Sequence, residues 1–156
     1  MPDTLTQASL GTLAAAVRRR LKHVVGARLV PYGLTIQQAW VMLVLLEHGP
    51  SSLHPLAQQV WMDDPTASRV VKAMVGRGLL RTQPDPRHGR RILISLTPEA
   101  QPTALELQKM VAGVRASIVR GMSPDQQELL REGLLTMIAN LDEMAADSAD
   151  PAAAAS

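Results

Sequence analysis

The segment from Leu53 to Leu96 constrains the fold of this chain more than any other. It combines two short helical patterns, a tight turn between them, and a hairpin pattern rich in arginine. Asp63 and Asp64 can cap the second helix, Pro65 suits its first turn, and Gly78 follows its expected last residue. This order of signals predicts a helix-turn-helix unit followed by a β-hairpin.

The second of these helices divides into two faces at about 100° per residue. One face is apolar and is expected to pack against the core through Ala67, Val70, Val71 and Met74. The opposite face, which is expected to be presented to solvent or to a partner, carries Pro65, Ser68, Arg69 and Lys72. Many globular domains carry such a helix with its cations in water, so this helix alone favours a solvated surface.

The hairpin pattern changes that balance. Leu79–Gln83 and Arg90–Leu96 are expected to form two strands, with Ile92, Ile94 and Leu96 on one face and Pro84, Pro86 and Gly89 between the strands. The expected tip carries Arg87, His88, Arg90 and Arg91. A tip has little core to protect, so these cations indicate either solubility or a polyanion, and insertion of arginine into a minor groove is one established use.

Charge is distributed unevenly along the chain. Formal charges are +3 for residues 1–62, +4 for residues 63–91 and −5 for residues 92–156, which together give the net +2. A basic head followed by an acidic C-terminal part is typical of a protein that meets phosphate with one end only.

An ordered set of short motifs resembles the MarR family of bacterial winged helix-turn-helix regulators through roughly residues 34 to 100. The set comprises Leu34–Gln38, Leu56-Ala57, Asp63–Arg69, Arg77–Leu80, Asp85–Arg91 and Leu96-Thr97. The D-x-R-x-x-R pattern of the wing, formed by Asp85, Arg87 and Arg90, is its most specific part. The chain departs from the family pattern at His88, where an acid is common, at Trp61, where a small residue is common, and at Ala100, where glycine is common.

The resemblance implies a mainly α fold with a small β-hairpin wing, in which a winged helix-turn-helix head stands on a helical dimerisation base. The head would span about 34–100 and the dimerisation helices about 5–30 and 103–147, within a single domain 1–147. The alanine-rich tail, 148–156, has no apolar stripe to bury and is expected to be disordered.

The resemblance also implies roles for individual residues. Pro65, Thr66, Ser68 and Arg69 would face the major groove, with Lys72 nearby for bases or phosphate. Arg87 would enter the minor groove beside His88 and Arg91, while Asp85 and Arg90 brace the wing. The partner would be double-stranded DNA, bound by a homodimer at an imperfect palindrome.

Local signals in the rest of the sequence predict the remaining helices. Leu10, Leu13, Val17, Leu21 and Val24 recur at helical spacing, Thr35 and Gln38 form a candidate capping box, and the run Ala39–Leu46 is apolar on every side and should be buried. Ser52 can cap the first helix of the reading head, and Thr97 can begin another helix with a kink or restart near Gln101. Ser123–Gln126 is expected to cap a last helix whose stripe includes Leu130, Leu134, Met137, Ile138, Leu141 and Met144. The first and last helices carry more apolar stripe than a small head could cover, which favours a dimer.

Composition excludes several classes of protein. The chain has no cysteine, which excludes thiol-based sensing and a cysteine zinc site, and its four histidines lack ligand spacing, so no metal or cofactor is expected. No catalytic constellation is present, so no enzyme is expected. The N-terminus lacks a signal peptide pattern and the longest apolar run is too short to cross a bilayer, so we expect a cytoplasmic protein without a membrane partner.

Two questions stay open at the level of sequence. The family resemblance suggests a small phenolic or aromatic acid effector, for which Arg19, His23, Tyr32 and Trp40 are candidate lining residues. The residue pattern by itself favours the core for Trp40 and a partly exposed helix position for His23. The function expected is a ligand-responsive repressor. The alternative is a winged-helix protein-interaction module without specific DNA binding, against which the basic wing and the Ser68, Arg69 and Lys72 face both argue.

Overall fold

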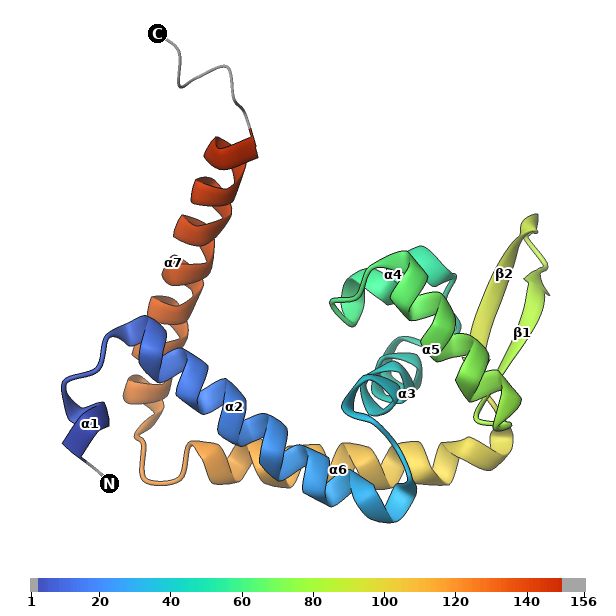
Figure 1. Cartoon of the computed structure of the whole chain (residues 1–156). Helices are drawn as coiled ribbons and strands as arrows, with labels where there is room; N and C mark the ends of the chain where they lie inside the picture. Colours follow the sequence, from blue (N-terminus) through green and yellow to red (C-terminus); the bar gives the residue numbers. More distant parts are fainter. Residues whose placement is uncertain (1–2, 150–156) are drawn as a thin grey trace, which may run out of the picture. The chain divides into compact units, whose positions relative to one another are not determined.

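The computed structural model describes residues 3–149 of the chain (Figure 1). Its elements are α1 (Asp3–Thr6), α2 (Leu10–Leu29), the 3₁₀ turn η1 (Val30–Tyr32), α3 (Ile36–His48), α4 (Leu53–Gln59), α5 (Asp64–Gly76), β1 (Leu80–Asp85), β2 (His88–Leu96), the 3₁₀ turn η2 (Pro98–Ala100), α6 (Gln101–Ile118) and α7 (Pro124–Ala149). The mainly α class with one two-stranded antiparallel hairpin is therefore confirmed. Residues divide into two compact units, one up to Val114 and one from Arg115.

The first unit begins with a helix that the sequence placed at about 5–30. The structure breaks this span: α1 ends at Thr6, and Ser9 caps α2 by accepting a hydrogen bond from the backbone N–H of Thr12 at 3.2 Å. Along α2 the predicted stripe is largely exposed, with 70% of Leu10 and 56% of Val17 open to solvent. Apolar side chains of this size in water favour a covering partner.

The capping box predicted before α3 is confirmed. Thr35 Oγ1 accepts from the backbone N–H of Gln38 at 3.2 Å, and Gln38 Oε1 accepts from the backbone N–H of Thr35 at 3.1 Å. The prediction that the whole Ala39–Leu46 run is buried is wrong at Trp40, which is 43% exposed. A helix has more than one side, and the core covers only the side that carries Ala39, Val41, Met42 and Leu45.

The head of the first unit is built from α3, α4, α5 and the hairpin, which gather together in Figure 1. Its core is closed by fully or nearly fully buried side chains from each of these elements and from the adjoining ends of α2 and α6: Leu29, Met42, Leu56, Met74, Leu80, Ile94 and Leu107. Ser52 is the N-cap residue of α4 as predicted, but its side chain makes no capping hydrogen bond.

The hairpin is longer than the sequence predicted. Pro84 and Asp85 belong to β1 and His88 and Gly89 to β2, so the turn is only Pro86-Arg87. Pro84 is tolerated because this sheet has only two strands, and a proline can place its nitrogen on an outer edge. Ser51, just before α4, adds an isolated bridge to Ile94 through backbone hydrogen bonds of 3.0 and 2.8 Å.

The connection into α6 confirms the predicted restart. Thr97 Oγ1 accepts from the backbone N–H of Ala100 at 3.3 Å, which caps η2, and α6 then begins at Gln101. The same hydroxyl donates to the carbonyl oxygen of Gly78 at 2.7 Å. Thr97 thus connects the segment before α6 to the turn that follows α5.

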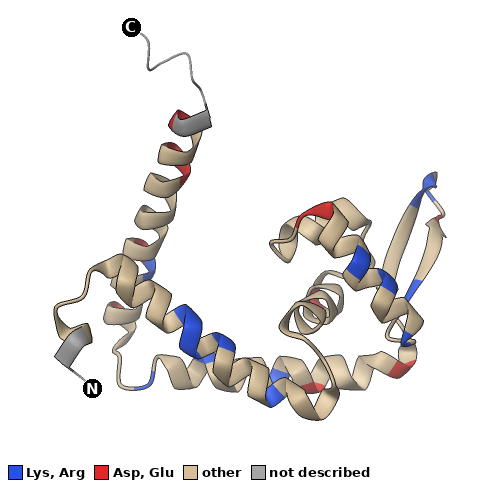
Figure 2. Ribbon diagram, viewed as in Figure 1, with Lys and Arg blue, Asp and Glu red and all other residues tan. Residues whose placement is uncertain are grey.

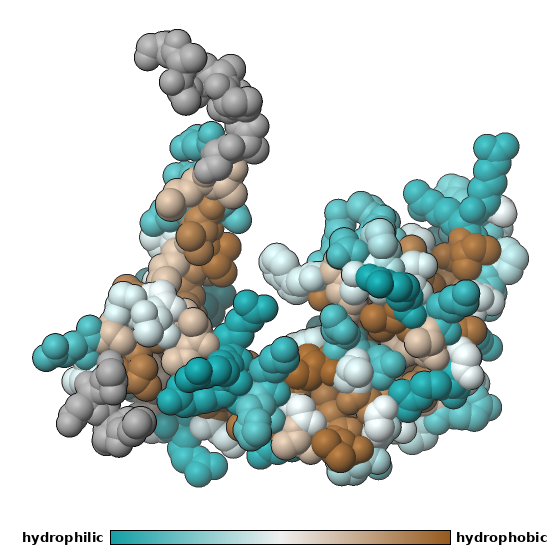
Figure 3. Space-filling model, in the orientation of Figure 1, coloured by the Kyte–Doolittle hydropathy of each residue, from teal (hydrophilic) through white to brown (hydrophobic). Residues whose placement is uncertain are grey.

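The second unit contains α7. Ser123 and Gln126 cap it reciprocally, with the Ser123 N–H donating to Gln126 Oε1 at 2.8 Å and the Gln126 N–H donating to Ser123 Oγ at 3.2 Å. Brown, apolar surface runs along this helix in Figure 3. Its exposed large apolar side chains include Leu129, Leu130, Leu134, Leu135, Ile138 and Leu141. Of the tail expected to be disordered, Ser148 and Ala149 are helical and residues 150–156 lie outside the described residues.

No single helix in residues 3–149 is long and apolar enough to span a membrane, although one pair bent by 79°, Leu10–Tyr32 with Ile36–His48, meets the length and composition requirement together.

Candidate nucleic-acid interface

Helix α5 has one buried face and one face presented to solvent. Ala67, Val71 and Met74 are buried and Val70 packs partly against the core, as the apolar periodicity predicted. The presented face is exposed, with Pro65, Ser68, Arg69 and Lys72 all open to solvent. Figure 2 shows the cations of α5 together with those of the hairpin in the same head. These two elements are fixed to each other, because Leu80 and Ile94 pack in the core that Met74 closes.

The first turn of α5 carries a chain of hydrogen bonds. Asp63 Oδ1 accepts from the backbone N–H of Thr66 at 2.7 Å, and Asp63 Oδ2 accepts from the Thr66 hydroxyl at 3.0 Å. Arg69 Nη2 in turn donates to Thr66 Oγ1 at 3.2 Å. The hydrogen bonds from the backbone and side chain of Thr66, with a smaller contribution from the Arg69 charge, lower the pKa of the Asp63 carboxyl. Of these residues, Asp63 was expected only as a cap.

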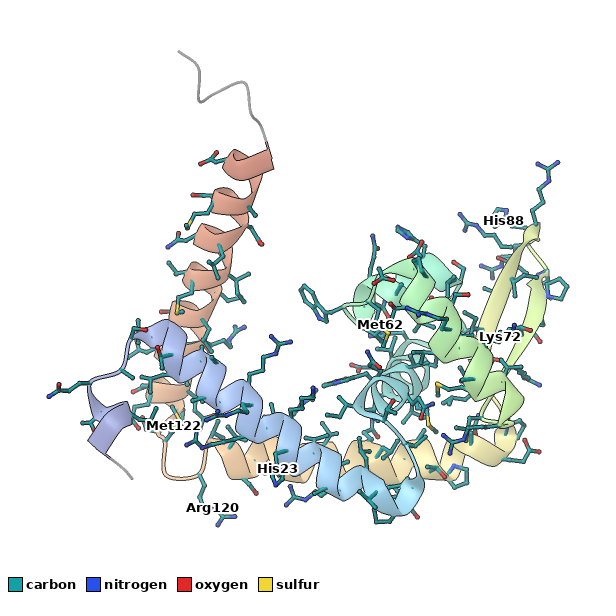
Figure 4. The ribbon with its side chains drawn as sticks, viewed as in Figure 1. His23, Met62, Lys72, His88, Arg120 and Met122 are labelled. Atoms are coloured by element: carbon teal, nitrogen blue, oxygen red, sulfur yellow. The ribbon has the colours of Figure 1, made fainter. Side chains whose placement is uncertain are left out.

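The wing carries its cations on the turn and the strand that follows it. Arg87, His88, Arg90 and Arg91 are all exposed, and Figure 4 places His88 at the tip of the hairpin. Pairing is regular up to Pro84 opposite Ile92, and then the register shifts, so that Asp85 pairs with His88. Three residues of β2, Gly89 to Arg91, therefore bulge between paired positions, and a bulge re-aims the side chains it carries.

Asp85 holds the wing turn through the backbone. Its Oδ1 accepts from the backbone N–H of Arg87 at 2.9 Å. Within residues 3–149 the structure records no ion pair between Asp85 and Arg90. The Asp85 carboxylate therefore orders the turn through the backbone and leaves the guanidinium groups of Arg87 and Arg90 available. Arg81, at the base of the wing, donates from Nε to Ser95 Oγ at 3.2 Å.

A shallow cavity of about 350 Å³ lies between α5 and the hairpin. It is lined by Leu53, Ser68, Val71, Lys72, Val75, Thr82, Ile92 and Ile94. The predicted strand face of Ile92, Ile94 and Leu96 thus turns toward α5, but only Ile94 and Leu96 are buried, and Ile92 stays 50% exposed on the cavity wall. Lys72 lies on this side of α5 (Figure 4).

Trp61, in the turn between α4 and α5, has an unusual backbone conformation. Trp61 has φ of +56°, the left-handed region that bulky residues rarely adopt, and its side chain is 94% exposed. Its N–H donates to the Gln58 carbonyl at 3.2 Å and the N–H of Met62 to the Ala57 carbonyl at 3.0 Å, the Schellman pattern that normally places glycine at this position.

A histidine that the sequence analysis did not single out joins the two helices of the motif. His54 on α4 contacts both carboxylate oxygens of Asp64 through Nδ1, at 3.1 and 3.0 Å, and its Nε2 lies 3.2 Å from Gln58 Nε2. Asp64 is the first residue of α5, so this contact helps to fix the angle between α4 and α5. An i to i+10 contact carries no periodic signal in the sequence.

Comparison with known proteins places this head in a family. A model of the MarR family matches residues 32–91. The crystal structure of a probable transcriptional regulator from Pseudomonas aeruginosa shares 31% identity, covering 85% of this chain and 98% of that one with a TM-score of 0.66. This chain belongs to the MarR family. It is therefore a transcriptional regulator of the winged-helix type.

Two further solved structures match in fold. S. aureus MepR in a complex with DNA has 16% identity and a TM-score of 0.79, covering 86% of this chain and 99% of that one. Bordetella bronchiseptica BpsR, whose DNA binding is regulated by 6-hydroxynicotinic acid, has 23% identity and a TM-score of 0.73, covering 88% of this chain and 97% of that one.

The four candidate effector residues of this MarR-family chain lie on three elements. Arg19 and His23 are exposed on α2, Tyr32 is half-buried in η1, and Trp40 is exposed on α3. None of them lines the cavity between α5 and the hairpin. Burial, together with the charge and hydrogen bonding of the Glu106 carboxylate, raises the pKa of the Tyr32 phenol. Within residues 3–149 no group of three or more histidine, cysteine or acidic side chains could hold a metal ion.

Proposed function

We propose that this protein is a sequence-specific DNA-binding repressor that acts as a homodimer in the cytoplasm and is released from its operator by a small aromatic acid. One observation carries the proposal: the exposed Arg69 face of α5 and the exposed Arg87 wing stand on one packed head. A helix that can enter a major groove, beside a basic hairpin that can enter the adjoining minor groove, is a complete reading unit.

Each group has a defined task in this proposal. Arg69 has the donor geometry to pair with guanine O6 and N7, and Pro65 and Ser68 flank it on the presented face. Lys72 contributes a base or phosphate contact. At the wing, Arg87 inserts into the minor groove from a turn that Asp85 orders, and His88, Arg90 and Arg91 lie along the adjacent backbone.

Dimerisation follows from the apolar surface outside the head. Both α2 and α7 expose rows of leucine, valine or isoleucine, and an isolated chain would leave these rows in water. A twofold dimer covers them and presents two recognition helices about 34–36 Å apart, so the operator is an imperfect palindrome. Sedimentation equilibrium is expected to give a dimer, and a monomer at micromolar concentration would contradict this part of the proposal.

The effector proposal rests on Arg19, His23, Tyr32 and Trp40, which offer cations and aromatic edges outside the reading face. BpsR supplies the precedent of a MarR-type fold whose DNA binding responds to an aromatic acid. Release requires a coupling free energy of about 1–3 kcal/mol between the two ligands. 6-Hydroxynicotinate and salicylate, titrated into the protein–operator complex, are suitable probes.

The proposal is tested by selecting bound fragments from a genomic DNA pool. Wild-type protein is expected to enrich one palindromic motif, and Arg69→Ala to bind with relaxed preference at one base pair of each half-site. Reporter expression from the enriched promoter then shows repression. If selection returns no shared motif, the chain is a winged-helix interaction module instead.

A further inference from the structure

Thr66 stands between the cap of α5 and the arginine of its presented face. The single proton of its hydroxyl is donated to Asp63 Oδ2 at 3.0 Å. One lone pair of the same oxygen accepts from Arg69 Nη2 at 3.2 Å. A hydroxyl has one proton and two lone pairs, so Thr66 has no proton left for an acceptor on a base edge, and only one lone pair stays open beside Arg69.

This arrangement fixes the guanidinium of Arg69. A hydroxyl that donates to a carboxylate becomes a better acceptor, so the Asp63 charge strengthens the hydrogen bond from Arg69 through Thr66. Arg69 spends one of its five N–H groups on Thr66 and keeps four for a partner. Its side chain would otherwise sample many rotamers in water, because the residue is exposed.

We propose that Asp63 and Thr66 are positioning residues, which hold Arg69 in a base-reading orientation before DNA arrives, and that Thr66 is not itself a reader of bases. The proposal rests on the proposed function, in which Arg69 meets a base edge. Ordering a long side chain on binding lowers affinity, so an arginine ordered in advance gains affinity and selectivity at its own base pair.

The residue types fit this role. Asp63 has two oxygens, one for the backbone N–H of Thr66 and one for its hydroxyl, whereas a cap alone needs only one acceptor. The lowered pKa of Asp63 shows that its charged form is favoured by these same contacts. A carboxylate close to DNA phosphates would otherwise weaken binding, and here its charge is directed at Thr66 and Arg69.

Three substitutions separate positioning from capping. Asp63→Asn keeps an oxygen for the backbone N–H but replaces the second oxygen with a donor, so it removes both the acceptor of the Thr66 proton and the negative charge beside the hydroxyl. Thr66→Val removes the hydroxyl at nearly constant shape, and Thr66→Ser restores it. Each variant is titrated against the selected operator and against operators changed at single base pairs, at matched salt, with unfolding midpoints measured in parallel.

We expect Asp63→Asn and Thr66→Val each to weaken operator binding by about three- to tenfold, with the loss concentrated at the base pair that Arg69→Ala also affects. Thr66→Ser should recover most of the loss. The deciding measurement is a double-mutant cycle: in the Arg69→Ala background, Thr66→Val should have no further effect on operator affinity.

Two results would overturn the inference. A loss from Thr66→Val that persists in the Arg69→Ala background would make Thr66 a direct DNA contact. Unchanged selectivity in both Asp63→Asn and Thr66→Val would mean that Arg69 needs no positioning. Both results require a wild-type protein that prefers its operator, and absence of that preference would count against the proposed function instead.

Discussion

Arg77, just after α5, donates a hydrogen bond from Nη1 to the carbonyl oxygen of Gly33, which lies 3.0 Å away and 44 residues earlier in the chain. The same nitrogen donates to Gln38 Oε1 at 3.2 Å, the oxygen that also completes the cap of α3. Arg77 thereby joins the end of the recognition helix to the connection between α2 and α3. Gly33 has φ of +60°, a backbone state that glycine adopts without strain.

Replacing Arg77 with methionine keeps much of the side-chain length and removes both hydrogen bonds. We expect a loss of about 1 kcal/mol in the free energy of unfolding, because the bonds are charge-assisted but exposed to water. Urea unfolding measures the change. Arg115→Met, at another exposed arginine, is the matched control, and equal effects of the two substitutions would contradict the role of Arg77.

Replacing Trp61 with glycine is expected to stabilise the fold. Its left-handed backbone costs about 1–2 kcal/mol for a residue with a Cβ, and glycine removes this strain but adds about 0.4–1 kcal/mol of unfolded-state entropy. Trp61→Gly should therefore raise the free energy of unfolding by about 0.5–1 kcal/mol, as measured by thermal or urea unfolding. Trp61→Ala keeps the Cβ and should show no such gain. A less stable glycine variant would show that the indole stabilises the fold.

Features that depend on neighbouring residues could be predicted from the sequence. The caps at Thr35, Asp63, Thr97 and Ser123 were correct, because each is decided by residues three apart. The apolar face of α5 was correct for the same local reason.

Features that depend on packing between distant segments were missed. The exposure of Trp40 depends on which side of α3 the head covers, and the contact between His54 and Asp64 depends on the angle between two helices. At the wing, the strands extend further than predicted because Pro84 finds a partner across the hairpin. The hydrogen bonds of the Thr66 hydroxyl with Asp63 and Arg69 could not be predicted either, since they depend on the rotamers of three side chains.

Asp63 makes stability depend on pH. Its pKa in the folded chain is lowered, chiefly by hydrogen bonds from Thr66, so its contribution is complete above the unfolded value of about 3.9 and is lost as the pH falls through the folded value. The difference in urea midpoint between wild type and Asp63→Asn should therefore shrink as the pH is lowered below about 4. A difference that stays constant between pH 7 and pH 2.5 would remove this carboxylate from the linkage.

Tyr32 is the only tyrosine in the chain, so its ionisation can be followed by ultraviolet absorbance. Burial, and then the Glu106 carboxylate, raise the pKa of the phenol above its usual value of about 10. Glu106→Gln should lower the midpoint of the absorbance titration toward that value. A midpoint below 10 in the wild type would contradict the surroundings described for Tyr32.

Removing the Arg87 side chain is expected to change how operator binding depends on salt. If it enters the minor groove from the turn ordered by Asp85, Arg87→Ala should weaken operator binding by about 10-fold and reduce the slope of log affinity against log salt by about one. Arg28→Ala, at an exposed arginine in the last turn of α2, is the control and should leave both quantities near wild type. Unchanged affinity of Arg87→Ala at matched salt would remove Arg87 from the interface.

In the proposed function, the presented face of α5 and the wing read a DNA sequence together. It is tested most directly by titrating the selected palindrome and a scrambled duplex of the same length at two salt concentrations. Both affinities should fall with salt, while the palindrome keeps a preference of at least about a thousandfold. Equal affinities that vanish together at the higher salt would mean attraction to phosphate alone, and would rule out sequence-specific reading by this head.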